Sequence, residues 1–273
     1  MLFTTIYGDN SQFNRLWSYV EHHLDANGLM NWKIGENGEV IGRGSATDAD
    51  EDIAYALILG EVRWPGHGYE LVANKMLHAI LAHESDRDGF LLPGDSWNTS
   101  EFLNPSYVSP TYYKRFAEVS GDLTWQHIAQ VNESWLLKTL FDRTGLAPDW
   151  AERSGHFQTD VFGYDAIRVP IRWLAFYRQS YDPQARRMLE QELRTLNTLK
   201  QQGLKAGYTL DGHPTVNYLN TDYLASFAAI SFCKPYSRLS LGLLWQLCHS
   251  QSKTYYGNAM KVWVMSLASN NLH

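Results

Sequence analysis

The stretch ATDADEDIAYA, residues 46–56, places four carboxylates within five consecutive positions and then continues directly into apolar helix formers. Thr47 or Asp48 can cap a helix that begins here, since their side-chain oxygens can accept from its first free amides. Acidic side chains in the first turn also meet the positive end of the helix dipole. On this interpretation Glu51 and Asp52 belong to a solvated helix start. Asp48 and Asp50 precede a tightly packed apolar face, where a carboxylate can be held rigidly and partly out of water. The stretch therefore predicts a helix with functional acids at its beginning.

The composition limits the class of protein. The 273 residues are 44% hydrophobic and contain no linker or low-complexity tract, so we expect a single domain with one large core. A net charge of -6 and the lack of a Lys/Arg cluster argue against a nucleic-acid partner. The sequence has no run that predicts a membrane span or a signal peptide. We expect a monomer without a membrane partner.

The two cysteines, Cys233 and Cys248, lack the spacing of a metal site. They are either core residues with free thiols or the two ends of one disulfide, and buried free thiols are favoured. The ten histidines form no ligand pattern such as HExxH. We therefore predict neither a metal nor another cofactor.

Apolar residues recur at helical spacing along most of the chain, and strand alternation is scarce. The faces run from Phe13 to Leu24, Val72 to His83, Trp125 to Leu140, Ile167 to Leu174, Leu189 to Leu196, Val216 to Ile230, Leu239 to Leu247 and Met260 to Leu267. With a helix after Asp48 and another around residues 113–119, this makes about ten helices joined by short turns. The pattern predicts an all-α toroid or bundle.

Two junctions, YGDNSQF at 7–13 and SGDLTW at 120–125, share a glycine that ends one helix and an Asp or Asn that can cap the next. They mark equivalent points of a repeated helical hairpin. The segment MLFTTIY before Gly8 is then the tail of a helix that starts upstream of Met1. A short helix that begins at Met1 is the alternative.

Aromatic residues make up 14% of the chain, and several stand beside Gly, Asn, Ser or Pro. Trp32, Trp97, Tyr107, Tyr112 and Tyr113 are expected in loops, where flat rings can stack on sugars or on bases. Because the basic signature of a nucleic-acid binder is absent, sugars are the favoured ligand.

Four blocks of sequence together resemble glycoside hydrolase family 8, once called cellulase family D. The first runs from Ala46 to Trp64, with Gly60 where the family pattern usually has Ala. The others are NPSYVSPTYY at 104–113, GYDAIRVPIRW at 163–173 and TYYGNAMKVW at 254–263. The resemblance extends over almost the whole chain. It implies an (α/α)6 barrel of inner and outer helices, incomplete at the N-terminus by one or two helices.

The resemblance also implies the roles of three residues. Asp165 would be the general base, and Asp48 would bind and distort the sugar in the central subsite. Arg168 lies one helical turn from Asp165 and can hold the base ionised and oriented. Asp165 could instead be a helix cap, and Arg168 an ordinary ion-pair partner. Asp50 would support Asp48.

Substrate contacts are implied for a further set of residues. Tyr164 and one of Tyr255 or Tyr256 would line the same cleft. The family places stacking aromatics near Trp32 and Tyr107, and Trp97 is the third loop platform.

The general acid of the family is a Glu in a Ser-Glu-Gly block upstream of the Asp48 motif. The acids between Met1 and Ala46, which are Asp9, Glu21, Asp25, Glu36 and Glu39, all lie in other contexts. We therefore expect the acid upstream of Met1. Inverting hydrolysis needs such an acid roughly 6.5–9.5 Å from the base, so that a water fits beside the sugar.

The resulting expectation is an inverting, exported (secreted or periplasmic) endo-β-1,4-glucanase acting on cellulose or mixed-linkage β-glucan. Family members acting on chitosan or xylan are alternatives, although the YDA position of the base favours the glucanase and xylanase branch. A different class of function is a non-catalytic carbohydrate-binding fragment. Polysaccharide lyases fit less well, because they need a Tyr or His base and a group that neutralises a uronic acid.

Overall fold

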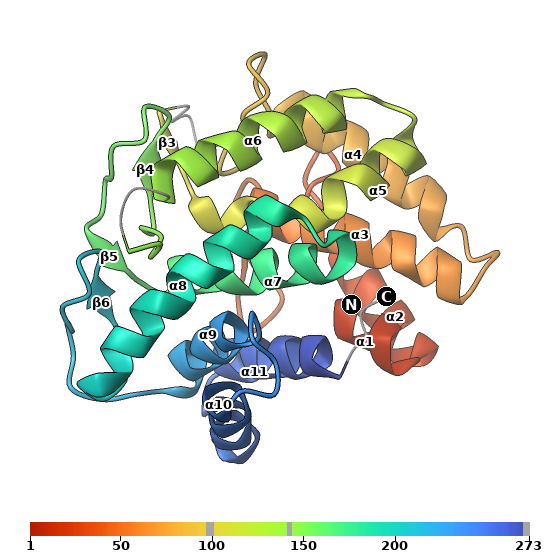
Figure 1. Cartoon of the computed structure of the whole chain (residues 1–273). Coiled ribbons are helices and arrows are strands. Elements are labelled where there is room, and N and C mark those ends of the chain that lie inside the picture. The colour runs from red at the N-terminus through yellow and green to blue at the C-terminus, as the bar shows by residue number, and fades with distance from the viewer. Residues whose placement is uncertain (97–100, 141–143, 270–273) are drawn as a thin grey trace. The chain divides into compact units, whose positions relative to one another are not determined.

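The computed structural model describes residues 1–96, 101–140 and 144–269. Within these ranges the chain forms eleven α-helices and only short strands of two or three residues (Figure 1), so the all-α prediction is confirmed. By its internal contacts the chain divides into two compact units. Unit 1 comprises residues 1–103 and 112–133, and unit 2 comprises residues 104–111 and 134–273. The single domain stays a prediction.

Unit 1 is built from helices and short strands near the N-terminus. Its elements are α1 (Leu2–Tyr7), α2 (Asn10–His22), β1 (Lys33–Ile34), β2 (Val40–Gly42), α3 (Thr47–Arg63), α4 (Tyr69–His83), β3 (Phe102–Leu103), most of α5 (Pro110–Ser120) and the first part of α6 (Thr124–Leu140). Strands β1 and β2 pair antiparallel. Helices α3 and α4 pack side by side.

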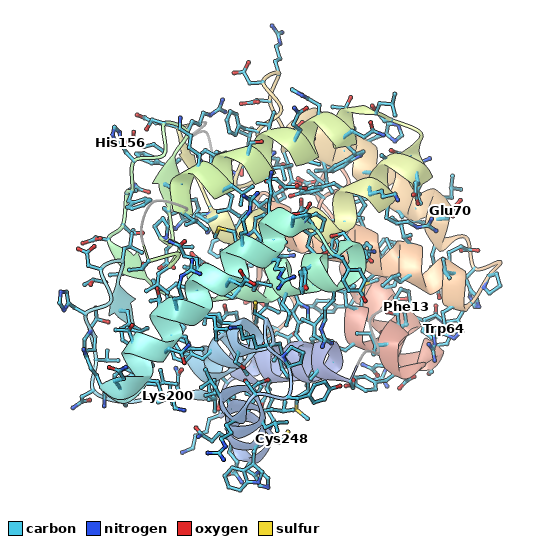
Figure 2. The ribbon with its side chains drawn as sticks, viewed as in Figure 1. Phe13, Trp64, Glu70, His156, Lys200 and Cys248 are labelled. Carbon is cyan, nitrogen blue, oxygen red and sulfur yellow. The ribbon has the colours of Figure 1, made fainter. Side chains whose placement is uncertain are left out.

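The packing of α2 on α3 explains an unusual glycine. Phe13 is fully buried and lies beside Trp64 (Figure 2), with 5.4 Å between the ring centroids. The centroid of the Tyr69 ring is 4.9 Å from that of Phe13. A Cβ on Gly60 would lie 2.8 Å from Phe13 Cζ and 3.2 Å from Tyr69 Cδ2. Gly60 therefore replaces the family's alanine because a large aromatic ring fills that space, as close packing of cores requires.

The start of α3 differs from the predicted solvated helix start. Ala46 stands at the N-cap without a capping side chain, and Thr47 donates its hydroxyl to the Leu92 carbonyl at 2.6 Å, so neither Thr47 nor Asp48 is the cap. Glu51 is fully buried, and Asp52 accepts a 2.8 Å hydrogen bond from the Tyr112 hydroxyl. The prediction was wrong for Glu51, whereas Asp52 remains partly exposed beside its tyrosine partner.

Unit 2 contains the remaining elements. They are η1 (Pro105–Tyr107), the end of α6, β4 (Ala151–Glu152), β5 (Val161–Phe162), η2 (Ala166–Arg168), α7 (Val169–Ser180), α8 (Pro183–Gln201), β6 (Tyr208–Thr209), α9 (Thr221–Ser231), α10 (Arg238–His249) and α11 (Tyr255–Ala268). Strands β5 and β6 pair antiparallel.

Helix α9 is the centre of unit 2. All of its residues from Thr221 to Ser231 are buried, and it packs against α7, α8, α10 and α11. A helix that is apolar all round has to be covered on all sides. It begins where the Asn220 side chain accepts from the Tyr223 amide at 3.1 Å, so the predicted face starting at Val216 extended too far upstream.

Four short hairpins share one geometry. They are closed by the isolated bridges Leu24–Met30, Ser85–Leu91, Ala151–Phe157 and Tyr208–Pro214. Each has a glycine with φ between 84° and 90°, at residues 28, 89, 155 and 212. In each, that glycine donates its amide to the carbonyl three residues before it. Only glycine adopts this left-handed conformation without cost, which explains its recurrence.

The two predicted glycine–aspartate junctions are confirmed as helix boundaries. Gly8 ends α1 with φ 79°, and Asp9 caps α2 by accepting from the Gln12 amide at 2.9 Å. Gly121 has φ 67°, and Asp122 accepts from the Thr124 amide at 2.9 Å. These caps stop one helix and begin the next within a few residues.

Several side chains lie elsewhere than predicted. Tyr112 and Tyr113 are buried on α5 rather than exposed in a loop, since Pro110 starts the helix earlier. Both cysteines are free thiols, as favoured, but Cys248 is exposed and Cys233 only half-buried. Among the described residues, no helix is long and apolar enough to cross a membrane.

Candidate active site

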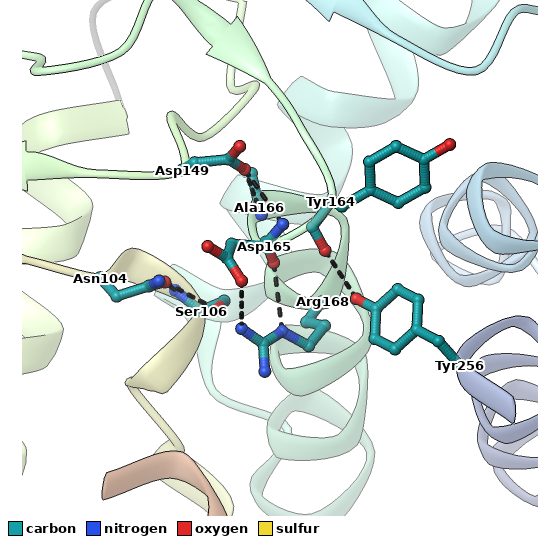
Figure 3. Close-up of polar contacts among 8 residues, drawn as sticks. All are labelled: Asn104, Ser106, Asp149, Tyr164, Asp165, Ala166, Arg168 and Tyr256. Atoms are coloured by element: carbon teal, nitrogen blue, oxygen red, sulfur yellow. Dashed lines mark hydrogen bonds and ion pairs between the residues drawn. The ribbon is translucent and has the colours of Figure 1, made fainter. Parts of the chain in front are cut away.

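The segment GYDAIRV, residues 163–169, leads from β5 through η2 into α7 (Figure 3). Pro170 lies in the first turn of α7, where a missing amide proton costs nothing. Asp165 occupies the N-cap position of η2, but its side chain makes no capping hydrogen bond. The carboxylate is therefore available for another partner, which argues against the simple cap.

That partner is Arg168. Arg168 Nη2 lies 2.8 Å from Asp165 Oδ1, and Arg168 Nε donates to the Asp165 backbone carbonyl at 3.3 Å. The Arg168 side chain is 14% exposed, whereas that of Asp165 is 39% exposed. A nearly buried cation thus holds a half-exposed carboxylate in one orientation, as the i+3 spacing predicts.

Tyr107 lies beneath this pair. The Arg168 guanidinium carbon is 5.5 Å from the centroid of the Tyr107 ring, a cation–π arrangement. Tyr107 is only 9% exposed, and η1 is held by Asn104 Oδ1, which accepts from the amide and the hydroxyl of Ser106 at 3.0 and 2.7 Å. Tyr107 therefore supports Arg168, and its contact with substrate stays a prediction.

Asp149 is a part of the site that the sequence did not reveal. Its Oδ1 accepts from the amides of Asp165 at 3.1 Å and of Ala166 at 2.8 Å. Burial is the largest influence and raises the pKa of Asp149, while the amide hydrogen bonds oppose this shift. No local spacing connects Asp149 with Asp165, because sixteen residues separate them. The sequence offered only weak signals, an aspartate in the non-helical segment APDW and a glycine at position 163.

Three tyrosines gather beside Asp165. The Tyr256 hydroxyl donates to the Tyr164 backbone carbonyl at 2.6 Å, and the Tyr164 hydroxyl accepts from Asn220 Nδ2 at 2.9 Å. The rings of Tyr164 and Tyr223 meet edge to face at 5.4 Å. Tyr164 is 48% exposed and so offers part of its ring to solvent.

Tyr255, at the start of α11, is 87% exposed and precedes the hydrogen-bonded Tyr256. In unit 2 the structure thus brings Asp165, Arg168, Tyr107, Tyr164 and Tyr256 together. A half-exposed carboxylate is thus surrounded by charged and aromatic groups that hydrogen bonds and ring contacts hold in place.

The remaining predicted residues belong to unit 1 or lie outside the described residues. Asp48 is partly exposed in the first turn of α3. Trp32 is 47% exposed, with Lys33 Nζ 5.6 Å from its ring centroid. Trp97 lies outside the described residues.

Asp50 is sealed within unit 1. It is fully buried, and its Oδ1 accepts from the Met30 amide at 2.8 Å. Glu84 is also fully buried and accepts a 2.5 Å hydrogen bond from the Ser45 hydroxyl. Burial, followed by the charge of Glu84, raises the pKa of Asp50 well above its usual range, and burial raises the pKa of Glu84 to about 8. The pair therefore retains a proton at neutral pH.

The charge arrangement defines what the Asp165 site can do. A half-exposed carboxylate that an arginine holds in one orientation can accept a proton from a water molecule. In residues 1–96, 101–140 and 144–269, no group of three or more His, Cys, Asp or Glu side chains could hold a metal ion. The site thus has the elements of a general base.

The chain belongs to the glycosyl hydrolases family 8, whose model matches residues 1–270. It is 31% identical to endoglucanase A of Acetivibrio thermocellus over 99% of this chain and 60% of that protein. It thus spans about 60% of the length of this relative.

Solved structures show the same fold. An apo β-1,3-1,4-glucanase from Paenibacillus sp. X4 matches with a TM-score of 0.88 and 24% identity, over 99% of this chain and 80% of the other. A reducing-end-xylose releasing exo-oligoxylanase matches with a TM-score of 0.84 and 19% identity, over 100% and 80%. These matches confirm the predicted (α/α)6 fold class.

Proposed function

We propose that this chain carries the general base and the sugar-binding surface of an inverting endo-β-1,4-glucanase acting on cellulose or mixed-linkage β-glucan. The proposal is carried by one observation, the half-exposed Asp165 carboxylate that Arg168 orients at 2.8 Å. It is supported by family membership and by the likeness to endoglucanase A.

Asp165 would remove a proton from a water molecule, which then attacks the anomeric carbon on the face opposite the leaving oxygen. Arg168 pairs with the Asp165 carboxylate and stabilises its orientation during the transfer. Attack from the opposite face inverts the configuration at that carbon.

The other roles follow from the family resemblance. Asp48 would bind the central sugar and favour its distortion. Tyr164 with Tyr255 or Tyr256 would contact neighbouring sugars, and Trp32 and Trp97 would supply further stacking surfaces. The proton donor would be a glutamate N-terminal to Met1. Because the substrate is a polymer outside the cell, we expect the protein to be exported.

The test is release of reducing ends from carboxymethylcellulose, barley β-glucan, chitosan and xylan. It compares this chain with a version extended by the family's glutamate-bearing helix, each also as Asp165→Asn. We expect the extended protein to hydrolyse the two glucans and Asp165→Asn to abolish the reaction.

The other outcomes separate the alternatives. Full activity of the unextended chain would mean that another of its carboxyl groups donates the proton. Preference for xylan or chitosan would change the substrate but keep the mechanism. Binding of glucan without turnover by either version would favour the non-catalytic carbohydrate-binding alternative.

A further inference from the structure

The carboxylate of Asp149 is attached to the backbone that carries the proposed base. Its Oδ1 accepts from two successive amides, those of Asp165 and Ala166, at 3.1 and 2.8 Å (Figure 3). The amide of Gly163 faces the same carboxylate. One side chain therefore fixes the turn from which the Asp165 side chain projects.

The approach is so close that it excludes a side chain at residue 163. A Cβ on Gly163 would collide with the carboxylate of Asp149. Gly163 does not have a positive φ, so its backbone conformation is open to other residues. The glycine is therefore required by the contact with Asp149 rather than by the turn itself.

We propose that Asp149 is a positioning residue for the reaction, which holds the backbone of Asp165 so that its carboxylate meets the attacking water in line. The inference rests on the proposed function of Asp165. Arg168 fixes the side chain of Asp165 from one side, and Asp149 fixes its main chain from the other. A displacement of about 1 Å in a catalytic group can reduce the rate on the order of 100-fold.

A second aspartate in the same unit provides a matched control. Asp182 caps α8 by accepting from the amides of Gln184 and Ala185 at 2.7 and 2.8 Å. It makes the same two hydrogen bonds as Asp149, but on a helix that carries no proposed site residue. A purely structural loss would affect the two positions alike.

The experiment measures kcat and KM on barley β-glucan for Asp149→Ala, Asp149→Asn and Asp182→Ala, in whichever version of the protein turns over. Thermal unfolding is followed in parallel, and the assay temperature is kept below every transition. We expect Asp149→Ala to lower kcat on the order of 100-fold with KM changed less than about threefold. Asp149→Asn keeps an acceptor oxygen and should recover kcat to within about tenfold of the wild type.

Gly163→Ala tests the same contact from the other side. Alone it should push the Asp149 carboxylate away and reproduce the loss of kcat. In the Asp149→Ala background the collision is relieved, so Gly163→Ala should add less than about twofold, a non-additivity that marks direct coupling.

The proposal is overturned if Asp149→Ala keeps kcat within twofold of the wild type, or if Asp182→Ala lowers kcat as much. It is also overturned if Asp149→Asn is no better than Asp149→Ala. A wild-type protein that cleaves none of the polysaccharides would instead overturn the proposed function, and the positioning role with it.

Discussion

Each unit has a carboxylate at the start of a helix, Asp165 at η2 of unit 2 and Asp50 in α3 of unit 1, and the two differ in exposure and in partners. The Asp165 side chain in unit 2 is 39% exposed and paired with a cation. Asp50 in unit 1 is fully buried, and this burial, followed by the charge of Glu84, raises its pKa. The first is open to water, whereas the second is closed off from it and holds the backbone through the Met30 amide. Surroundings, rather than residue type, determine whether a carboxylate is open to solvent or closed off from it.

The strongest test of this comparison makes the same substitution, Asp to Asn, at each of the two sites. Asp165→Asn should lower kcat by about 10²- to 10⁴-fold, because it removes the proton acceptor, with little change in Tm. Asp50→Asn should leave kcat within about threefold, since the amide keeps an acceptor for Met30. Hydrolysis of barley β-glucan and thermal unfolding measure both. Equal losses of activity would break the comparison.

Removing the buried acceptor altogether should affect stability. Asp50→Ala leaves the Met30 amide without its partner, which costs about 1–3 kcal/mol in the free energy of unfolding. Such a loss lowers Tm by about 2–4 °C for each kcal/mol. Urea unfolding of Asp50→Ala beside Asp50→Asn checks this, and an unchanged midpoint for Asp50→Ala would show that the hydrogen bond is dispensable.

Replacing Arg168 by lysine should lower activity even though the positive charge beside Asp165 is kept. Arg168→Lys keeps the charge but cannot bond the carboxylate and the carbonyl of Asp165 together, so we expect kcat to fall roughly tenfold. The exposed pair Arg115–Glu118, at 3.0 Å, offers a control in Arg115→Lys. If both substitutions leave kcat unchanged, Arg168 does not orient the base.

The buried pair should respond to pH. A carboxyl whose pKa is raised on folding contributes its stability below its unfolded pKa and loses it as the pH rises toward the folded pKa, here about 8 for Glu84. The free energy of unfolding should therefore decrease between pH 5 and 8 by up to about 1.4 kcal/mol per unit. Glu84→Gln keeps an acceptor for Ser45 and should flatten this dependence, as unfolding in buffered urea would reveal.

Much of the fold follows from local signals in the sequence. The helical period located most helices, and Gly8 with Asp9 predicted a boundary that the structure confirms. The burial of Glu51 could not be predicted, because the elements that cover it come from elsewhere in the chain. Local patterns report the helix but not what packs on it.

The candidate site likewise contains one part that the sequence predicted and one part that it did not. The spacing of Asp165 and Arg168 within one helical turn predicted their ion pair. Asp149 was missed because its carboxylate accepts from backbone amides that lie about sixteen positions further along the chain. Backbone amides are present at almost every residue, so the pattern of side chains does not indicate such a contact. Gly163 carried the complementary signal, but a glycine in a turn has many explanations.

The four glycine hairpins have a kinetic consequence. Each closes between residues six apart, as in the bridge between Leu24 and Met30, so closure costs little chain entropy. Contacts this local form early in folding. We therefore expect the amides of Gly28, Gly89, Gly155 and Gly212 to gain protection in pulsed hydrogen exchange before those of the buried helix α9. The hairpins would then set the direction of successive helices before any core has formed.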